Sequence, residues 1–194
     1  MSDSRMSTYS PLPIDLVKGQ GAIVTDSQGR EYLDALAGIA VCSLGHAHPA
    51  VHKALCDQSQ KLIHCSNLYS IGIQHQLADK LTSLSKMDKV FFSNSGAEAN
   101  EAAIKIARLY GHNKDIKNPT IIVMEKAFHG RTLATLTATG TRKIQAGFEP
   151  LVQGFMRVPY NDIEAIENIA ATQSEVVAIL VEPVQGEAGI VIPD

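Results

Sequence analysis

The second half of the chain alternates between short apolar runs and segments of helical periodicity, and this pattern limits the fold more than any other feature. The apolar runs lie at residues 90–92, 120–124 and 176–181. Between them, residues 97–110 and a segment that starts at Asn161 place apolar side chains three and four positions apart, as on one face of a helix. Gly111 is expected to end the first of these helices, Asn161 is expected to cap the second, and a further helix is expected to start at Gly130. Strands and helices in alternation predict an α/β domain with a mostly parallel central sheet. The run at 176–181 is apolar throughout, which predicts a strand covered on both faces.

The first half of the chain has a different pattern. Residues 21–35 contain two short runs around a polar turn and predict a β-hairpin. Pro49 is expected to open a helix, because proline suits the first helical turn, and residues 74–84 predict a second amphipathic helix. The change in pattern predicts two domains: residues 1–86 as the N-terminal segment of a small domain with connecting helices, and residues 87–194 as the first part of a large α/β domain.

Composition excludes several classes of protein. The 194 residues carry 17 basic and 20 acidic side chains, a formal net charge of −3, which argues against a protein that coats nucleic acid or an anionic membrane. No apolar run has the roughly 18 residues of a membrane span, and the N-terminus does not resemble a secretory signal. The cysteines, Cys42, Cys56 and Cys65, lack the spacing of a metal or redox motif and are interpreted as reduced thiols. These features predict a cytoplasmic protein.

Residues 93–101 follow a predicted strand and open a predicted helix. Ser95 and Glu98 have the spacing of a capping box. Gly96 permits close approach of a ligand, and the first turn of a helix offers unpaired N–H groups at the positive end of its dipole, which suits an anion. A plain helix cap accounts for the same residues, and on these residues alone it is the favoured interpretation.

Residues 128–131, Phe-His-Gly-Arg, follow the predicted strand at 120–124. In an open parallel sheet, ligands bind beyond the carboxyl ends of the strands. The ring of Phe128 is suited to stacking on a planar ligand, and the guanidinium of Arg131 is suited to a bidentate contact with a carboxylate. A surface loop with one half-buried phenylalanine is an equally good interpretation of these residues alone.

Residues 182–187, Glu-Pro-Val-Gln-Gly-Glu, follow the last predicted strand. Glu182 and Glu187 would lie at the carboxyl end of that strand, where carboxylates can pair with a substrate amine, a lysine or an arginine. Acidic residues are also common at this position as plain caps of the next element.

His46 and His48 raise the question of a metal site. Alternation along an extended segment would place both imidazoles on one face. No cysteine or acidic residue is expected nearby to complete a ligand shell. A turn that contains a hydrogen-bonded histidine is therefore favoured, and no metal is predicted.

Taken together, the motifs resemble those of the class III aminotransferases, which use pyridoxal 5'-phosphate (PLP), and within that family they are most similar to the acetylornithine aminotransferases. The segments that carry the resemblance are residues 32–34, 36–41, 44–49, 66–69, 95–103, 128–131 and 182–187. The resemblance implies the PLP-dependent transferase fold, which is aspartate aminotransferase-like and of fold type I. It also implies transamination of N2-acetylornithine, a small-molecule amino donor, with 2-oxoglutarate in arginine biosynthesis, by a homodimer.

The resemblance assigns cofactor contacts to five residues. Gly96 and Ala97 would bind the cofactor phosphate through their backbone N–H groups, with Ser95 beside them. Phe128 would stack on the pyridine ring. Glu182 would lie below the cofactor as a supporting group.

Two further residues are assigned to the substrate. Arg131 would bind its α-carboxylate, and Glu187 would act as a gate that pairs with an arginine when the amino donor enters. The family's Schiff-base lysine, and the aspartate that holds the pyridine nitrogen, match no position in residues 1–194. The chain is therefore expected to be the N-terminal portion of an aminotransferase, without its catalytic lysine and inactive alone.

Two sets of alternatives stay open. Within the family, the amino donor could be ornithine, succinylornithine or 4-aminobutyrate. In another class, the chain could be a non-catalytic fragment that acts only in interaction or dimerisation.

Overall fold

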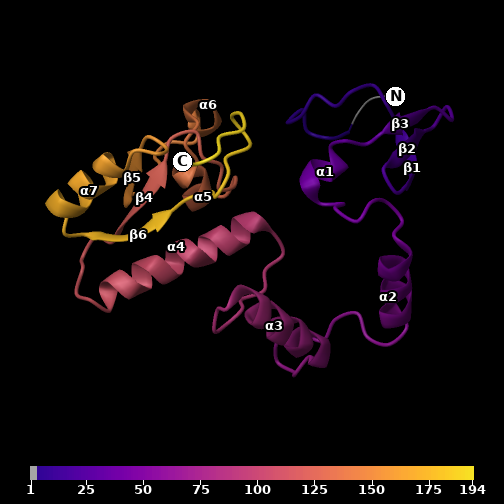
Figure 1. The fold of residues 1–194 in the computed structure, drawn as a ribbon, viewed down its shortest axis with the longest axis horizontal. Coiled ribbons are helices and arrows are strands. Elements are labelled where there is room, and N and C mark those ends of the chain that lie inside the picture. Colours follow the sequence, from indigo (N-terminus) through magenta and orange to yellow (C-terminus); the bar gives the residue numbers. More distant parts are fainter. Residues whose placement is uncertain (1–3) are drawn as a thin grey trace. The chain divides into compact units, whose positions relative to one another are not determined.

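The structure is a computed structural model that describes residues 4–194. The chain divides into two compact units, Met1–His75 and Gln76–Asp194 (Figure 1). Each unit contains its own three-stranded sheet. The predicted assignment of residues 1–86 and 87–194 to two domains of an aminotransferase stays a prediction.

The first unit is built on an antiparallel sheet in the order β1-β2-β3. Its strands are β1 (Leu16–Gln20), β2 (Ile23–Asp26) and β3 (Glu31–Leu33). The predicted hairpin is confirmed, since β2 and β3 pair antiparallel through Val24 and Tyr32. β1 was not predicted, because its Leu-Val-Lys-Gly-Gln sequence has no clear alternation.

Asp26 organises the turn of this hairpin from a buried position. Its carboxylate accepts hydrogen bonds from the amides of Gln28 and Arg30, each at 2.9 Å, from Nε of Arg30 at 2.7 Å and from the hydroxyl of Tyr32 at 2.9 Å. Burial alone would raise the pKa of Asp26, but these hydrogen bonds outweigh it and lower the pKa to about 2. The turn is therefore stabilised by an ionised carboxylate.

Three short helices follow the hairpin. α1 (Ala37–Ala40) is irregular, because Gly38 and Ile39 have φ values of 64° and 58°. α2 (Pro49–Ser59) begins at Pro49, as predicted. α3 (Gly72–Ser85) contains the second predicted helix, and neither α2 nor α3 has a buried side chain.

The second unit has the predicted α/β organisation. Its elements are α4 (Gly96–His112), β4 (Thr120–Met124), α5 (Leu133–Ala138), α6 (Arg142–Gln145), β5 (Phe155–Val158), α7 (Ile163–Thr172) and β6 (Val176–Leu180). The strands form a parallel sheet in the order β5-β4-β6. The mostly parallel sheet predicted from the sequence is confirmed.

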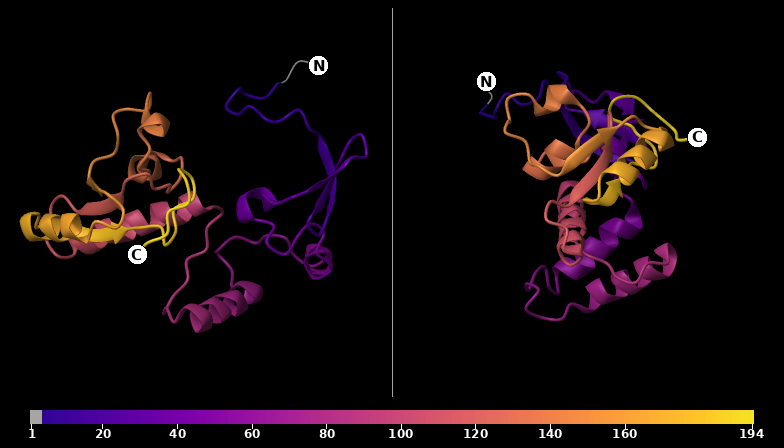
Figure 2. Two further views of the ribbon diagram at one scale, coloured as in Figure 1. Left: turned by 45° about the horizontal axis from the view of Figure 1, so that its top comes forward. Right: turned by 90° about the vertical axis from the view of Figure 1, so that its left-hand side faces the viewer.

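Helices cover both faces of the central strand β4, as can be followed in Figures 1 and 2. Ile121 and Val123 pack with Ile104 of α4 and Ala138 of α5. On the opposite face, Ile122 and Met124 pack in a cluster that includes Ala165, Ile166 and Ile169 of α7. Successive side chains of a strand point to opposite faces, so an unbroken apolar run suits this central position.

Two strand predictions need correction. Residues 90–92 do not form a strand, and Phe91 is 69% exposed. A strand needs a hydrogen-bonded neighbour, and residues 90–92 are not among the paired strands of the sheet, which are β5, β4 and β6. β6 is present, but Ile179 is 49% exposed, so this strand is not covered on both faces. β5, with Arg157 inside its Phe-Met-Arg-Val sequence, was not predicted.

The helix ends differ from the prediction at three positions. Asp162 caps α7 through a 2.8 Å hydrogen bond from the Ala165 amide, whereas Asn161 has a φ of 64°. Gly111, which was expected to end α4, lies inside the helix; a Cβ there would come within 2.8 Å of Pro119 and Val177, so the residue serves close packing. The helix expected to start at Gly130 begins at Leu133 instead, because Gly130 has a φ of 136°.

Candidate functional site

The N-terminus of α4 has free backbone donors. Ser95 caps the helix, and its hydroxyl accepts a hydrogen bond of 3.2 Å from the Glu98 amide, as predicted. The Glu98 carboxylate accepts from the amide of Asn94, at 2.6 Å, rather than from that of Ser95. The amides of Gly96 and Ala97 belong to the first turn and have no partner within the helix. A Cβ built on Gly96 meets no atom within 4 Å, so the space beside these donors is open.

The loop at residues 128–131 packs directly against the start of α4. The side-chain amide of Asn100 donates a 2.8 Å hydrogen bond to the carbonyl oxygen of His129. A Cβ on Gly130 would lie 2.9 Å from Cβ of Ala97 and 2.5 Å from Oγ1 of Thr135. Only glycine permits this approach, which places the loop beside the free amides of α4.

Glu182 joins the same cluster from the end of β6. One carboxylate oxygen accepts a 3.0 Å hydrogen bond from the backbone amide of Phe128. Phe128 and Glu182 are both half-buried. Three segments far apart in sequence therefore meet at the carboxyl edge of the parallel sheet, as the sequence analysis expected of ligand-binding residues.

The two residues assigned to the substrate are exposed. The Arg131 guanidinium lies over the ring of Phe128, 5.6 Å from its centroid. Glu187 lies in the loop after β6, which is closed by a bridge between Gln185 and Val191. In the described part of the chain, Glu187 has no interaction with the other predicted site residues.

Several residues that hold this site together were not singled out from the sequence. Glu101 accepts hydrogen bonds from the hydroxyl of Thr132 and, at 3.2 Å, from the amide of Thr135. Gln185 is buried, and its side chain donates a 2.9 Å hydrogen bond to the carbonyl oxygen of Glu125. Asn100 and Glu101 lie about one turn after the Ser95 cap, and residues at that position face any segment that packs against the start of the helix. This position was the sequence signal that could have identified them.

His129 is the buried titratable group of the cluster. Its side chain is almost fully buried, and its Nε2 atom has no hydrogen-bond partner within the described residues. Its backbone amide donates a 3.0 Å hydrogen bond to Oγ1 of Thr139. Burial lowers the pKa of His129, because the charged imidazolium loses its hydration. The ring is therefore neutral at physiological pH.

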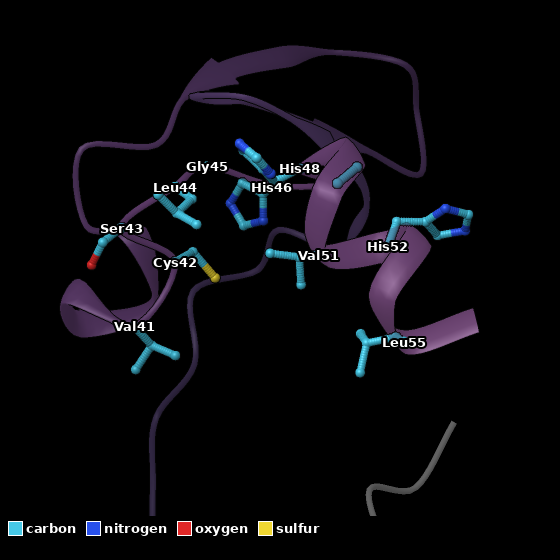
Figure 3. A pocket seen from close by; sticks show the side chains of 11 residues that line it. Val41, Cys42, Ser43, Leu44, Gly45, His46, His48, Val51, His52 and Leu55 are labelled. Carbon is cyan, nitrogen blue, oxygen red and sulfur yellow. The ribbon is translucent and has the colours of Figure 1, made fainter. Parts of the chain in front are cut away.

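A different hollow, of about 450 Å³, lies in the first unit (Figure 3). His46 lies on its wall, and its Nε2 is 2.6 Å from a carboxylate oxygen of Asp34. The expectation that no acidic residue lies near these histidines is therefore wrong for His46, because the fold brings Asp34 to it from 12 residues upstream. Among residues 4–194, no three histidine, cysteine or acidic side chains lie close enough together to hold a metal ion.

The donors at the sheet edge fit PLP: open helix-terminal amides for a phosphate, an aromatic ring and a carboxylate. The fold is that of the PLP-dependent transferases of fold type I. The family model for class-III aminotransferases matches residues 5–194, and the chain belongs to this family. In the described residues, no helix has the length and apolar character needed to cross a membrane.

Among curated relatives, the acetylornithine aminotransferase of Nitrosomonas europaea is 64% identical over 188 residues, which are 97% of this chain and 48% of that protein. That of Thermosynechococcus vestitus is 57% identical, over 95% of this chain and 46% of the relative. The chain thus spans about half the length of the curated relatives it matches.

Solved structures that resemble the chain in fold are also aminotransferases. The ornithine aminotransferase from Toxoplasma gondii has a TM-score of 0.93 at 34% identity, covering 98% of this chain and 46% of the other. The acetylornithine aminotransferase from Elizabethkingia anophelis has a TM-score of 0.82 at 35% identity, covering 98% of this chain and 44% of the other.

Proposed function

We propose that the full-length protein transaminates N2-acetylornithine with 2-oxoglutarate, using PLP, and serves arginine biosynthesis. The observation that carries this proposal is the meeting of the α4 N-terminus, Phe128 and Glu182 at one edge of the sheet. The choice of amino donor rests on relatives that are named acetylornithine aminotransferases.

In this proposal, the chain holds the cofactor from three sides. The amides of Gly96 and Ala97 bind the phosphate, assisted by the helix dipole, and Ser95 keeps the first turn capped. Phe128 stacks on the pyridine ring. Glu182 accepts a hydrogen bond from the backbone amide of Phe128 and so fixes the position of the phenylalanine ring relative to the cofactor. When bound, PLP supplies an electron sink for cleavage of a bond at the amine-bearing carbon of the substrate.

Two residues act on the substrate side of the site. Arg131 binds the α-carboxylate through its planar pair of donors. Glu187 pairs with an arginine of the full-length protein when the amino donor is bound, and releases it for the oxo acid. Both side chains are exposed, as groups that meet a diffusing substrate must be.

The remaining parts of the site are assigned to the full-length protein beyond residues 1–194. We place the Schiff-base lysine there and expect the 194-residue chain alone to be inactive. We also propose a cytoplasmic homodimer whose interface includes residues 35–44 and 66–69. Exposed apolar side chains such as Ile39, at 81%, and Leu68, at 86%, support this assignment.

Steady-state kinetics of the full-length protein test the proposal. With PLP and 2-oxoglutarate, kcat/KM should be highest for N2-acetylornithine among the four candidate donors. A higher value for ornithine, succinylornithine or 4-aminobutyrate would reassign the donor within the family. If no donor is turned over and borohydride fixes no cofactor to the protein, the catalytic proposal is wrong and a pure interaction module is favoured.

A further inference from the structure

Two adjacent residues of α4 hold the loop on both sides of Arg131. The side chain of Asn100 donates to the carbonyl oxygen of His129 at 2.8 Å, two residues before the arginine. The carboxylate of Glu101 accepts from the hydroxyl of Thr132, the residue that follows the arginine. Both anchors lie one turn beyond Gly96 and Ala97, so one helix carries the proposed phosphate donors and the supports of the loop.

Arg131 itself does little to fix its own position. Its side chain is exposed, and its described contact is with the ring of Phe128 in the same loop. A bidentate contact with a carboxylate needs the guanidinium held within a fraction of an ångström of its productive place. The backbone on either side of Arg131 must therefore be held by other elements, and Asn100 and Glu101 make those connections.

Glu101 has a second effect on the same segment. It also accepts a 3.2 Å hydrogen bond from the amide of Thr135, in the first turn of α5, where a negative charge is favourable. Thr132 and Thr135 cap this helix between themselves as well. Loss of the Glu101 carboxylate should therefore loosen the loop on the C-terminal side of Arg131 without unfolding α5.

We infer that Asn100 and Glu101 are positioning residues that connect the loop around Arg131 to α4. They thereby fix the position of the substrate carboxylate relative to the cofactor phosphate. This inference rests on the proposed function, because it concerns the arginine assigned to the substrate. Asn100 and Glu101 act through the loop and touch neither substrate nor cofactor.

The test uses the full-length holoenzyme and the variants Glu101→Ala, Glu101→Gln and Asn100→Ala. Trypsin cleavage between Arg131 and Thr132, followed by mass spectrometry, reports how firmly the loop is held. KM for 2-oxoglutarate, kcat and the Kd of PLP are measured alongside. Lys105→Gln, at an exposed position of the same helix, is the matched control.

Glu101→Ala should raise both the cleavage rate and KM about tenfold, the scale of losing a hydrogen bond to a charged group. We expect kcat to change less than about threefold and the Kd of PLP less than about twofold, because the first turn of α4 is intact. Asn100→Ala should act in the same direction, and Glu101→Gln, which keeps an acceptor oxygen, should lie between Glu101→Ala and wild type. Lys105→Gln should match wild type.

Two results would overturn the inference. One is wild-type cleavage and KM in both alanine variants. The other is a joint loss of kcat, substrate affinity and PLP affinity in Glu101→Gln, which would indicate a general structural role. A wild-type protein that does not transaminate would defeat the proposed function instead, and the trypsin result would still decide whether α4 holds the loop.

Discussion

The two units each contain a three-stranded sheet but stabilise it in different ways. Among the described residues, Val24 is the one buried hydrophobic side chain of the first unit, and it lies beside the buried carboxylate of Asp26. The other nine buried hydrophobic side chains belong to the second unit, around β4. A parallel sheet with helices on both faces creates a continuous core, whereas a small antiparallel hairpin sheet depends on the polar network in its turn.

The first unit also exposes much apolar surface. Leu36, Ile39, Val41 and Leu44 are each between 66% and 81% exposed. The second unit exposes apolar side chains as well, for example Phe91 at 69% and Ile190 at 74%. The two units therefore differ in how much apolar side-chain surface they bury and not in whether they expose any.

The largest expected effect is in the core of the second unit. Ile122→Ala should lower the free energy of unfolding by about 3–4 kcal/mol, because Ile122 is completely buried and the cavity cannot close. Hydrogen exchange of residues 119–126 in the full-length protein measures the loss. Ile163→Ala, at a position 64% exposed, is the control and should change stability by under about 1 kcal/mol. Equal effects of the two variants would show that the core around β4 is not the stabilising element.

Arg131→Lys separates function from stability within the same unit. Lysine offers a point charge in place of the paired donors of arginine, so kcat/KM for both the amino and the oxo substrate should fall about 10- to 150-fold, a loss of about 1.5–3 kcal/mol. The exposed position predicts a change in unfolding free energy within about 0.5 kcal/mol. Unchanged kcat/KM for both substrates would show that Arg131 does not bind the carboxylate.

Asp26→Asn should weaken only the first unit. Because the pKa of Asp26 is lowered to about 2 from the ordinary 3.8, its contribution to stability is complete above pH 4 and is lost as the pH falls towards 2. The variant should speed hydrogen exchange at residues 23–33, leave residues 119–126 unchanged, and remove this acid dependence. Asp57→Asn, which removes a surface pair with Lys53, is the control. Faster hydrogen exchange in both units would show that the effect of Asp26 is not confined to the first unit.

The smallest expected effect concerns His129. Its pKa lies below the ordinary value of 6.5, so the unfolded chain binds a proton more readily and stability falls as the pH drops below about 6.5. His129→Leu, similar in volume and without an unpaired nitrogen, should remove this acid dependence and leave stability at pH 8 nearly unchanged. Urea unfolding of the full-length protein at pH 8, 6 and 5 provides the test. The same pH dependence in both proteins would mean that His129 is not its source.

Local patterns predicted the parts of the fold that depend on local order. The apolar run at 120–124, the turn at 26–29 and the Ser95 cap each contain their own signal, and the structure has all three. The strand predicted at residues 90–92 was wrong because an apolar run forms a strand only when it pairs with another strand, and local sequence does not show that pairing. β5 was missed because its single exposed arginine interrupts an otherwise apolar run.

The contacts between the candidate site residues could not be predicted from local sequence. Phe128 and Glu182 are 54 residues apart, and their hydrogen bond depends on β4 and β6 lying side by side. The anchors Asn100 and Glu101 look like ordinary polar helix residues until the loop packs against them. Sequence motifs therefore named candidate site residues, and the packing of Gly130 on Ala97 explains how the segments that carry them are brought together.

If the start of α4 binds the cofactor phosphate, Gly96→Asp should change the Kd of PLP in the full-length protein. The position is open and does not have a positive φ, and an acidic side chain suits the first helical turn, so the fold should be retained. Gly96→Ala adds the carbon without the charge and is the matched control. We predict that the aspartate weakens PLP binding at least about tenfold by repelling the phosphate, while binding of pyridoxal, which lacks the phosphate, stays the same. Wild-type affinity of Gly96→Asp for PLP would contradict the account.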